Sequence, residues 1–183
     1  MNDNGYCMGY GGFDRRLILL FVLSLSCLLF CVKSHAQMNN NHVLLSVGAL
    51  YERGFDATVS YEHSGRYHNA WEYFFTYYLK YKDDPAAGHI TTKSFWNSYN
   101  TWHLGIAYKP CVRRGRNHHG NLRLGASGGS DTEHFRAGIH VGYEHTFALK
   151  RGWELFFQVR EDFIIKGEDI FRTGVSLGVK APL

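Results

Sequence analysis

The side chains in this chain that could do acid–base or metal chemistry are histidines and carboxylates at well-separated positions. His103, His140, Glu72, Glu144 and Asp162 could form a proton-transfer set or a metal site. They lack the regular ligand spacing that a metal site shows, and no Ser–His–acid grouping stands out in the sequence. We therefore expect no catalytic residue, no bound metal and no cofactor, and a protein that is not an enzyme.

A second set of histidines is numerous enough to suggest a metal site, but its members are scattered over several predicted loops and turns. Its members are His68, His89, His118, His119 and His134. Because the segments that carry them are predicted at different ends of the fold, we expect solvated loop residues and not a metal centre.

The densest run of positive charge is Arg113, Arg114 and Arg116, with no acidic residue beside it. Two interpretations stay open, namely a contact for a periplasmic partner or for anionic headgroups, and a solvated turn. Cys111 lies just before this run and is the one cysteine after the predicted cleavage site. It could pair with another chain, or it could be incidental.

The elements that must position these groups are β-strands, because apolar and polar residues alternate with a period of two. The segment from Trp153 to Ala181 is the clearest example. Most of its odd positions are apolar or aromatic, and its even positions are mostly charged or small. The same alternation returns along the mature chain, with no helical segment between. Strands are predicted near 43–51, 55–62, 71–81, 95–109, 121–127, 135–147, 153–162 and 171–180, and the one at 121–127 is short and weak.

Such a sheet must either pack on a second layer or close on itself. No amphipathic helix is predicted to cover it, whereas closure pairs every edge and satisfies the backbone in hydrocarbon. The fold class predicted is all-β, an eight-stranded antiparallel up-and-down transmembrane β-barrel. At that size side chains fill the interior, so an open pore is not expected.

The inward positions form a predicted structural network of charges in the lumen. Six acids can neutralise six bases there, as buried charges require. The network is Glu52, Glu62, Glu72, Lys80, Arg123, Arg136, Glu144, Glu154, Arg160, Asp162, Arg172 and Lys180.

The N-terminus has the features of a secretory signal peptide. Arg15 and Arg16 precede an apolar stretch at 17–32, and Ser34-His35-Ala36 is a small-x-small cleavage site. We predict a signal peptide at 1–36, cleavage near Ala36, and a barrel domain at 37–183. Either Met1 or Met8 could be the start.

The composition of the 183-residue chain agrees with one such domain. Aromatic residues make up 16%, the net charge is +4, and the mean hydropathy is −0.28. The low hydropathy is compatible with a membrane barrel, because only every second residue faces lipid. The basic residues are dispersed, so direct nucleic-acid binding is not expected.

The C-terminal third resembles the TraO family of conjugative transposons from Bacteroides-type bacteria. The resemblance lies in Ala137–Glu144, Leu155–Asp162 and the closing strand Phe171–Lys180, with a short glycine-rich stretch at Asn121–Gly128. It implies an outer-membrane protein of a Gram-negative donor cell that acts with other proteins of the conjugation apparatus. The family supplies no enzymatic residues to carry over.

Three hypotheses for function follow. The first is a non-enzymatic outer-membrane barrel of a conjugative transfer apparatus, in contact with outer-membrane lipid and partner proteins. The second is a lipid-modifying barrel enzyme that uses His103, His140 or Glu144. The third is an adhesin that uses the predicted loops Asp83–Lys93 and Gly128–His134.

Overall fold

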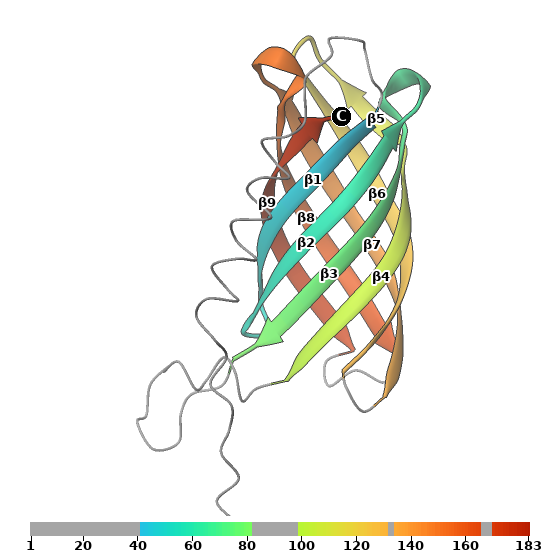
Figure 1. Cartoon of the computed structure of the whole chain (residues 1–183), viewed down its shortest axis with the longest axis vertical. Coiled ribbons are helices and arrows are strands. Elements are labelled where there is room, and N and C mark those ends of the chain that lie inside the picture. Colours follow the sequence, from blue (N-terminus) through green and yellow to red (C-terminus); the bar gives the residue numbers. More distant parts are fainter. Residues whose placement is uncertain (1–40, 82–98, 132–133, 166–169) are drawn as a thin grey trace, which may run out of the picture. The chain divides into compact units, whose positions relative to one another are not determined.

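The structure, a computed structural model, describes residues 41–81, 99–131, 134–165 and 170–183, and these residues form one antiparallel sheet. Two single-turn 3-10 helices, η1 at Arg66–His68 and η2 at Lys150–Gly152, lie in turns (Figure 1). The strands are β1 Asn41–Leu50, β2 Gly54–Ser64, β3 Ala70–Lys80, β4 Asn100–Lys109, β5 Cys111–Arg114, β6 His118–Ser130, β7 Phe135–Ala148, β8 Glu154–Ile165 and β9 Phe171–Pro182.

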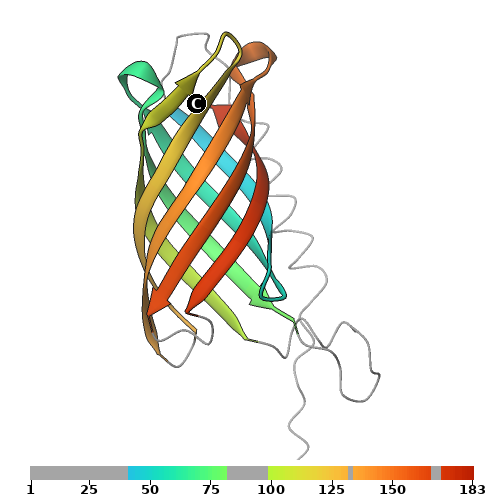
Figure 2. The ribbon, with the colours of Figure 1, turned by 180° about the vertical axis from the view of Figure 1, so that it is seen from behind.

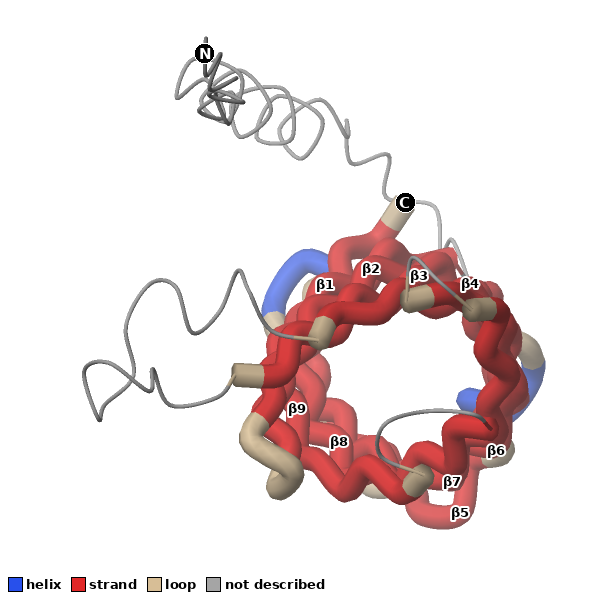
Figure 3. Tube along the Cα trace, turned by 90° about the horizontal axis from the view of Figure 1, so that it is seen from below, coloured by secondary structure: helices blue, strands red, loops and turns tan. Residues whose placement is uncertain are grey.

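The sheet closes into a barrel. Sequential strands pair as neighbours except β4 and β5, β1 pairs with β9, and β4 pairs with β6 from Trp102↔Ser130 to Tyr108↔Leu124. Figure 2 shows the barrel wall from behind, and Figure 3, seen from below, shows the strands as a continuous ring. β4 and β5 follow each other across Pro110 and both pair with β6, so the barrel has eight strand places. The predicted fold class is confirmed.

The strand predicted at 121–127 is wrong in length. β6 has 13 residues and pairs along its whole length with β7, and Gly128–Ser130 belong to it instead of to a loop. Its glycines hide the alternation, because a glycine shows neither an apolar nor a polar side chain. The length of β6 is defined by its backbone pairing with β4 and β7, because the side-chain pattern does not show it.

The two ends of the barrel differ in their connections. β1 starts and β9 finishes at the same end, where His42 pairs with Pro182. This end, called the termini end below, also carries the turns 65–69, 115–117 and 149–153. The turn 51–53 lies at the other end, called the loop end, where β3, β6 and β8 finish and β4, β7 and β9 begin. The loop predicted at Asp83–Lys93 and the signal peptide fall outside the described residues.

Side chains alternate between the lumen and the exterior along each strand, as the sequence predicts. In β2 the even positions are buried and the odd positions are exposed, and β9 repeats this pattern. The exterior is apolar on every side of the barrel. Members of this surface include Val47, Val59, Phe75, Leu104, Ile106, Leu124, Ile139, Val141, Phe157, Val159, Val175 and Leu177, with exposed fractions between 39% and 68%. The described helices are all too short to cross a membrane.

Aromatic side chains gather on the exterior near both ends. Trp71, Phe147 and Trp153 are exposed near the termini end, and the Trp71 ring lies 5.0 Å from that of Tyr108. Near the loop end the exposed aromatics are Tyr51, Phe55, Trp102, Phe135 and Phe171. Two aromatic girdles flanking an aliphatic band are typical of barrels that cross a bilayer.

Gly129 is a position where barrel closure depends on the absence of a side chain. A Cβ built there would lie 1.9 Å from the main-chain oxygen of Trp102, across the β4–β6 pairing. Backbone cannot move aside as a flexible side chain can. We expect Gly129→Ala to lower the free energy of unfolding by about 1–3 kcal/mol, measured by urea titration of tryptophan fluorescence after refolding into lipid vesicles.

Gly65→Ala is the matched control. Gly65 is exposed in a turn, and its nearest contact for a new Cβ is the main-chain oxygen of Asn69 at 3.4 Å. Equal stabilities of the two variants would contradict the role assigned to the β4–β6 pairing.

Candidate functional site

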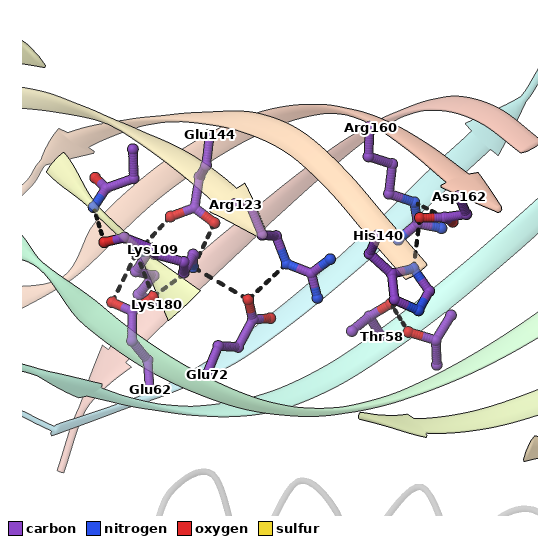
Figure 4. Close-up of polar contacts among 12 residues, drawn as sticks. Thr58, Glu62, Glu72, Lys109, Arg123, His140, Glu144, Arg160, Asp162 and Lys180 are labelled. Atoms are coloured by element: carbon purple, nitrogen blue, oxygen red, sulfur yellow. Dashed lines mark hydrogen bonds and ion pairs between the residues drawn. The ribbon is translucent and has the colours of Figure 1, made fainter. Parts of the chain in front are cut away.

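The polar residues of the lumen gather in two groups along the barrel axis. The Lys109 cluster, toward the termini end, consists of Glu62, Glu72, Lys109, Arg123, Glu144 and Lys180. The His140 cluster, toward the loop end, consists of Asp56, Ser127, His140, Arg160 and Asp162. Figure 4 shows the Lys109 cluster at one side of the view and His140, Arg160 and Asp162 of the second cluster at the other.

The Lys109 cluster is built on two lysines that join opposite walls of the barrel. Lys109 Nζ lies 2.5 Å from Glu62 Oε2 and 2.6 Å from Glu144 Oε2. Lys180 Nζ lies 2.9 Å from Glu62 Oε1 and 2.8 Å from Glu144 Oε1. Each glutamate therefore binds both lysines, and the four side chains close a ring of ion pairs across the lumen.

Glu72, the third carboxylate of the cluster, adds a further negative charge that the cations of the cluster must balance. Glu72 pairs directly with Glu62 between β3 and β2, so two buried carboxylates face each other on the same surface. Like charges in that arrangement repel. Lys109 Nζ approaches Glu72 Oε2 to 3.4 Å and Arg123 Nε lies 2.8 Å from the same oxygen. Three cations thus balance three anions.

The Arg123 guanidinium also lies over the Phe74 ring, 4.4 Å from its centre. Phe74, Tyr78, Phe156 and Ile164 are buried inward residues that fill the space between charged groups. Ion pairs and these apolar side chains together occupy the interior. The prediction that the barrel is filled instead of open is consistent with this packing.

The His140 cluster forms a chain of hydrogen bonds across β8, β7 and β6. Asp162 Oδ1 lies 2.7 Å from His140 Nδ1, and His140 Nε2 lies 2.6 Å from Ser127 Oγ. The other carboxylate oxygen of Asp162 lies 3.2 Å from Arg160 Nε, and Arg160 also binds Asp56. No Ser–His–acid grouping stands out in the sequence, but strand pairing brings the side chains of residues 127, 140 and 162 within hydrogen-bond distance.

A small cavity of about 20 Å³ opens beside this chain. Its lining includes His103, His140, Asp162 and Arg172. Arg172 is only 3% exposed, donates to Thr101 Oγ1 at 3.3 Å, and stacks on the Tyr78 ring at 4.0 Å. Within the described part of the chain, Nε and Nη2 of Arg172 and Nε2 of His103 are buried without a hydrogen-bond partner.

Three of the twelve predicted network residues lie at the margin of the lumen network. Glu52 lies in the turn 51–53 and accepts a bond from the main-chain N–H of Thr173, so it is not a lumen residue. Lys80 ends β3 and is half-buried. Glu154 is half-buried at the start of β8, 4.0 Å from Lys180 Nζ. The alternation with a period of two gives these three residues the parity of inward positions. It does not show where along each strand the lumen ends.

Arg136, another predicted network member, is buried and pairs with Asp131 at the loop end. Sequence reasoning missed Lys109, Asp56 and Asp131. Lys109 and Asp56 have the parity of inward residues on β4 and β2, so the signal that finds them is the same alternation. Asp131 follows β6, outside the alternating pattern.

Three of the scattered histidines lie beside another histidine ring. His68 stacks on His119 with ring centres 4.6 Å apart, and His118 lies 5.3 Å from His145. No group of three or more potential ligands is present among the described residues. His134 lies at the loop end, where its N–H donates to Asp131 Oδ1 at 2.8 Å. His89 is outside the described residues.

The predicted arginine run is part of a larger basic rim at the termini end. Arg113, Arg114 and Arg116 are exposed, and the Arg114 guanidinium lies 4.9 Å from the centre of the Tyr67 ring. The neighbouring turns add Arg66, Lys150 and Arg151, and none of the three turns contains an acidic residue. Cys111 is a free thiol on β5, and its Sγ contacts the main-chain oxygen of Arg113 at 3.3 Å.

Comparison with known proteins gives similar folds and no sequence family. No protein-family model and no curated protein matches the chain. The crystal structure of a major outer membrane protein from Thermus thermophilus is similar with a TM-score of 0.52 and 12% identity, over 78% of this chain and 98% of that one.

Two further structures match with lower scores. Neisserial surface protein A has a TM-score of 0.47 and 16% identity, over 78% of this chain and 94% of that one. A de novo designed transmembrane β-barrel has a TM-score of 0.46 and 9% identity, over 81% of this chain and 100% of that one. At these identities the likeness concerns the fold. The fold and the lumen define a small, closed antiparallel barrel of the outer-membrane type with a charge-paired interior.

Removing Lys109 leaves the three buried carboxylates of the Lys109 cluster with two cations, Lys180 and Arg123. We expect Lys109→Met to lower the free energy of unfolding by about 3–5 kcal/mol, because Glu62, Glu72 and Glu144 each lose their contact with its Nζ and one buried negative charge is left unbalanced. The measurement is urea titration of the refolded protein in lipid vesicles. Lys150→Met, at an exposed position of η2, serves as the control and is expected to unfold as the wild type does.

A Lys109→Met variant as stable as the control would show that the ring of ion pairs is not required for the folded barrel.

Proposed function

We propose that the protein is an integral barrel of the outer membrane of a Gram-negative bacterium. The apolar exterior supports this most strongly, because it surrounds the whole barrel and is flanked by aromatic girdles at both ends. Such a surface would aggregate in water, whereas lipid covers it without cost to the backbone, which is fully paired in a closed barrel. The signal peptide expected at 1–36 provides the route of export.

Within that membrane the barrel acts as a rigid anchor and not as a channel. Its cross-section is occupied by the Lys109 cluster and by inward aromatic side chains. Moving ions through it would require separating buried ion pairs, which costs several kcal/mol for each charge exposed. An anchor of this kind needs no reaction of its own, and the role proposed is non-enzymatic.

The process served by the anchor is proposed to be conjugative DNA transfer. This finer statement rests on the resemblance of the C-terminal strands to TraO-like proteins. The basic rim supports it by giving the termini end, which is periplasmic when both termini face the cell interior, a surface for acidic segments of other apparatus proteins. Outer-membrane lipid and these proteins are the proposed partners, and no direct contact with nucleic acid is proposed.

The membrane assignment is tested by fractionation. The expressed protein is expected in the outer-membrane fraction, to require detergent for extraction, and to migrate faster in SDS gels before boiling than after. These results follow from an apolar exterior on a barrel that resists SDS while folded. Recovery as a monodisperse protein in buffer without detergent would overturn the assignment.

The transfer role is tested in a donor strain. Deletion of the gene is expected to reduce transfer frequency, because the apparatus would lose its anchor in the outer membrane. Replacement of Arg113, Arg114 and Arg116 by Gln is expected to reduce it as well, with the barrel still folded. Arg53→Gln in the turn at the loop end is the control. Unchanged transfer after deletion would remove the conjugation proposal and leave the membrane barrel standing.

A further inference from the structure

We infer that two copies of this chain pair side by side in the membrane through the outward face of β8 and β9, with Glu161 of one copy bonded to Glu161 of the other. The inference rests on the proposed membrane location and goes beyond the anchoring role. It starts from one polar side chain whose outward position an apolar lipid environment does not explain.

Glu161 interrupts the apolar exterior of the barrel. It has the outward parity of β8 and lies between Val159 and Phe163, which are 41% and 38% exposed. The other outward residues of β8, from Leu155 to Ile165, are all apolar. The outward positions of β1–β4, β6, β7 and β9 carry no Asp, Glu, Lys or Arg. Since β8 has 12 residues and is long enough to cross the hydrocarbon, Glu161 faces lipid tails.

The hydrogen bonds of Glu161 leave its carboxyl group incompletely satisfied. Thr173, its direct partner on β9, donates from Oγ1 to Glu161 Oε2 at 2.6 Å. Among the described residues, the side chain of Glu161 makes no other hydrogen bond and no ion pair. Lipid tails offer neither donors nor acceptors, and ionisable side chains inside a membrane pair with one another or with a partner. The missing partner therefore comes from another molecule in the membrane.

A second copy of the chain supplies that partner at the correct depth. Copies inserted in the same direction are related by a two-fold axis along the membrane normal, so each outward residue meets its counterpart at equal depth. Two carboxyl groups that meet outside water share protons, because like charges so close cannot both ionise. A carboxyl group that holds a proton offers one donor and one acceptor, so the pair is self-complementary. An unrelated basic partner would need its own cation at the same depth.

The surface around Glu161 allows two barrels to approach closely. Its direct neighbours on the adjacent strands are Val141 on β7 and Thr173 on β9, and Val175 is its diagonal neighbour on β9. These short, β-branched side chains let the backbones of two membrane segments come near each other, where packing and hydrogen bonds between them act. By contrast, most outward residues of β3, across the ring, carry aromatic rings, namely Trp71, Tyr73, Phe75 and Tyr77.

Disulfide cross-linking of the full-length protein, refolded into lipid vesicles, locates the contact. The variants carry Cys111→Ser, so that the native thiol does not react. Val175→Cys is expected to give cross-linked dimers on oxidation, because it lies beside Glu161 and is 48% exposed. Leu104→Cys is the matched control and is expected to stay monomeric. Leu104 is 56% exposed on β4, across the ring from β9 (Figure 3).

Energy transfer between dyes on the native Cys111 measures the strength of association as added lipid dilutes the protein. The wild type is expected to associate. Glu161→Leu is expected to weaken association by about tenfold, because the hydrogen bonds between copies are lost while an apolar surface remains. Glu161→Gln is expected to associate within about threefold of the wild type, since an amide also carries a donor and an acceptor without a charge.

The wild-type measurements decide the question even if a variant fails to fold. A wild type that inserts as a monomer overturns the inference and leaves the membrane location standing, whereas failure to insert counts against the membrane location itself. Equal cross-linking through Val175→Cys and Leu104→Cys overturns the inference, because the contact then has no preferred face. Undiminished association of Glu161→Leu also overturns it. A Glu161→Gln variant as weak as Glu161→Leu does so too, since Glu161 then pairs as an anion with a basic group.

Discussion

The requirement that every charge inside a narrow closed barrel find a partner governs the structure. Lys109 is fully buried, and so are the glutamates that it joins. A single missing cation would leave carboxylates facing one another in a medium with little water. The ring of Glu62, Lys109, Glu144 and Lys180 meets this requirement by linking opposite walls. The same contacts stiffen the barrel and block its axis, which is why the lumen suits an anchor.

The exterior of the barrel meets a second requirement, that apolar side chains be kept from water. Its side chains are apolar around the whole circumference, and the backbone is satisfied by strand pairing that includes β4 with β6. A soluble sandwich would hide one such face against a second layer, but here the described strands form a single ring. One physical rule, that polar groups must be paired and apolar groups kept from water, thus assigns every second residue to lipid and the rest to the lumen.

The loop end of the lumen departs from complete pairing. Arg172 and His103 keep buried nitrogen atoms without acceptors among the described residues, and they lie around the cavity that adjoins His140. The termini end has no comparable excess of donors in the described lumen, because three cations there meet three anions. The two parts of the described lumen therefore differ in how completely their buried polar groups are paired.

The sequence by itself determined which residues face lipid and which face the lumen, because the side-chain period of a strand is two whatever its partners are. It also determined the strand count and most of the lumen charges, including Glu62, Glu144 and Lys180. The tertiary structure alone decided the length of β6, where glycines erase the pattern. It also decided which charges meet, and that Ser127, His140 and Asp162 form one chain. Those facts depend on the register between strands, and register is fixed by backbone pairing across the barrel instead of by any local pattern of residues.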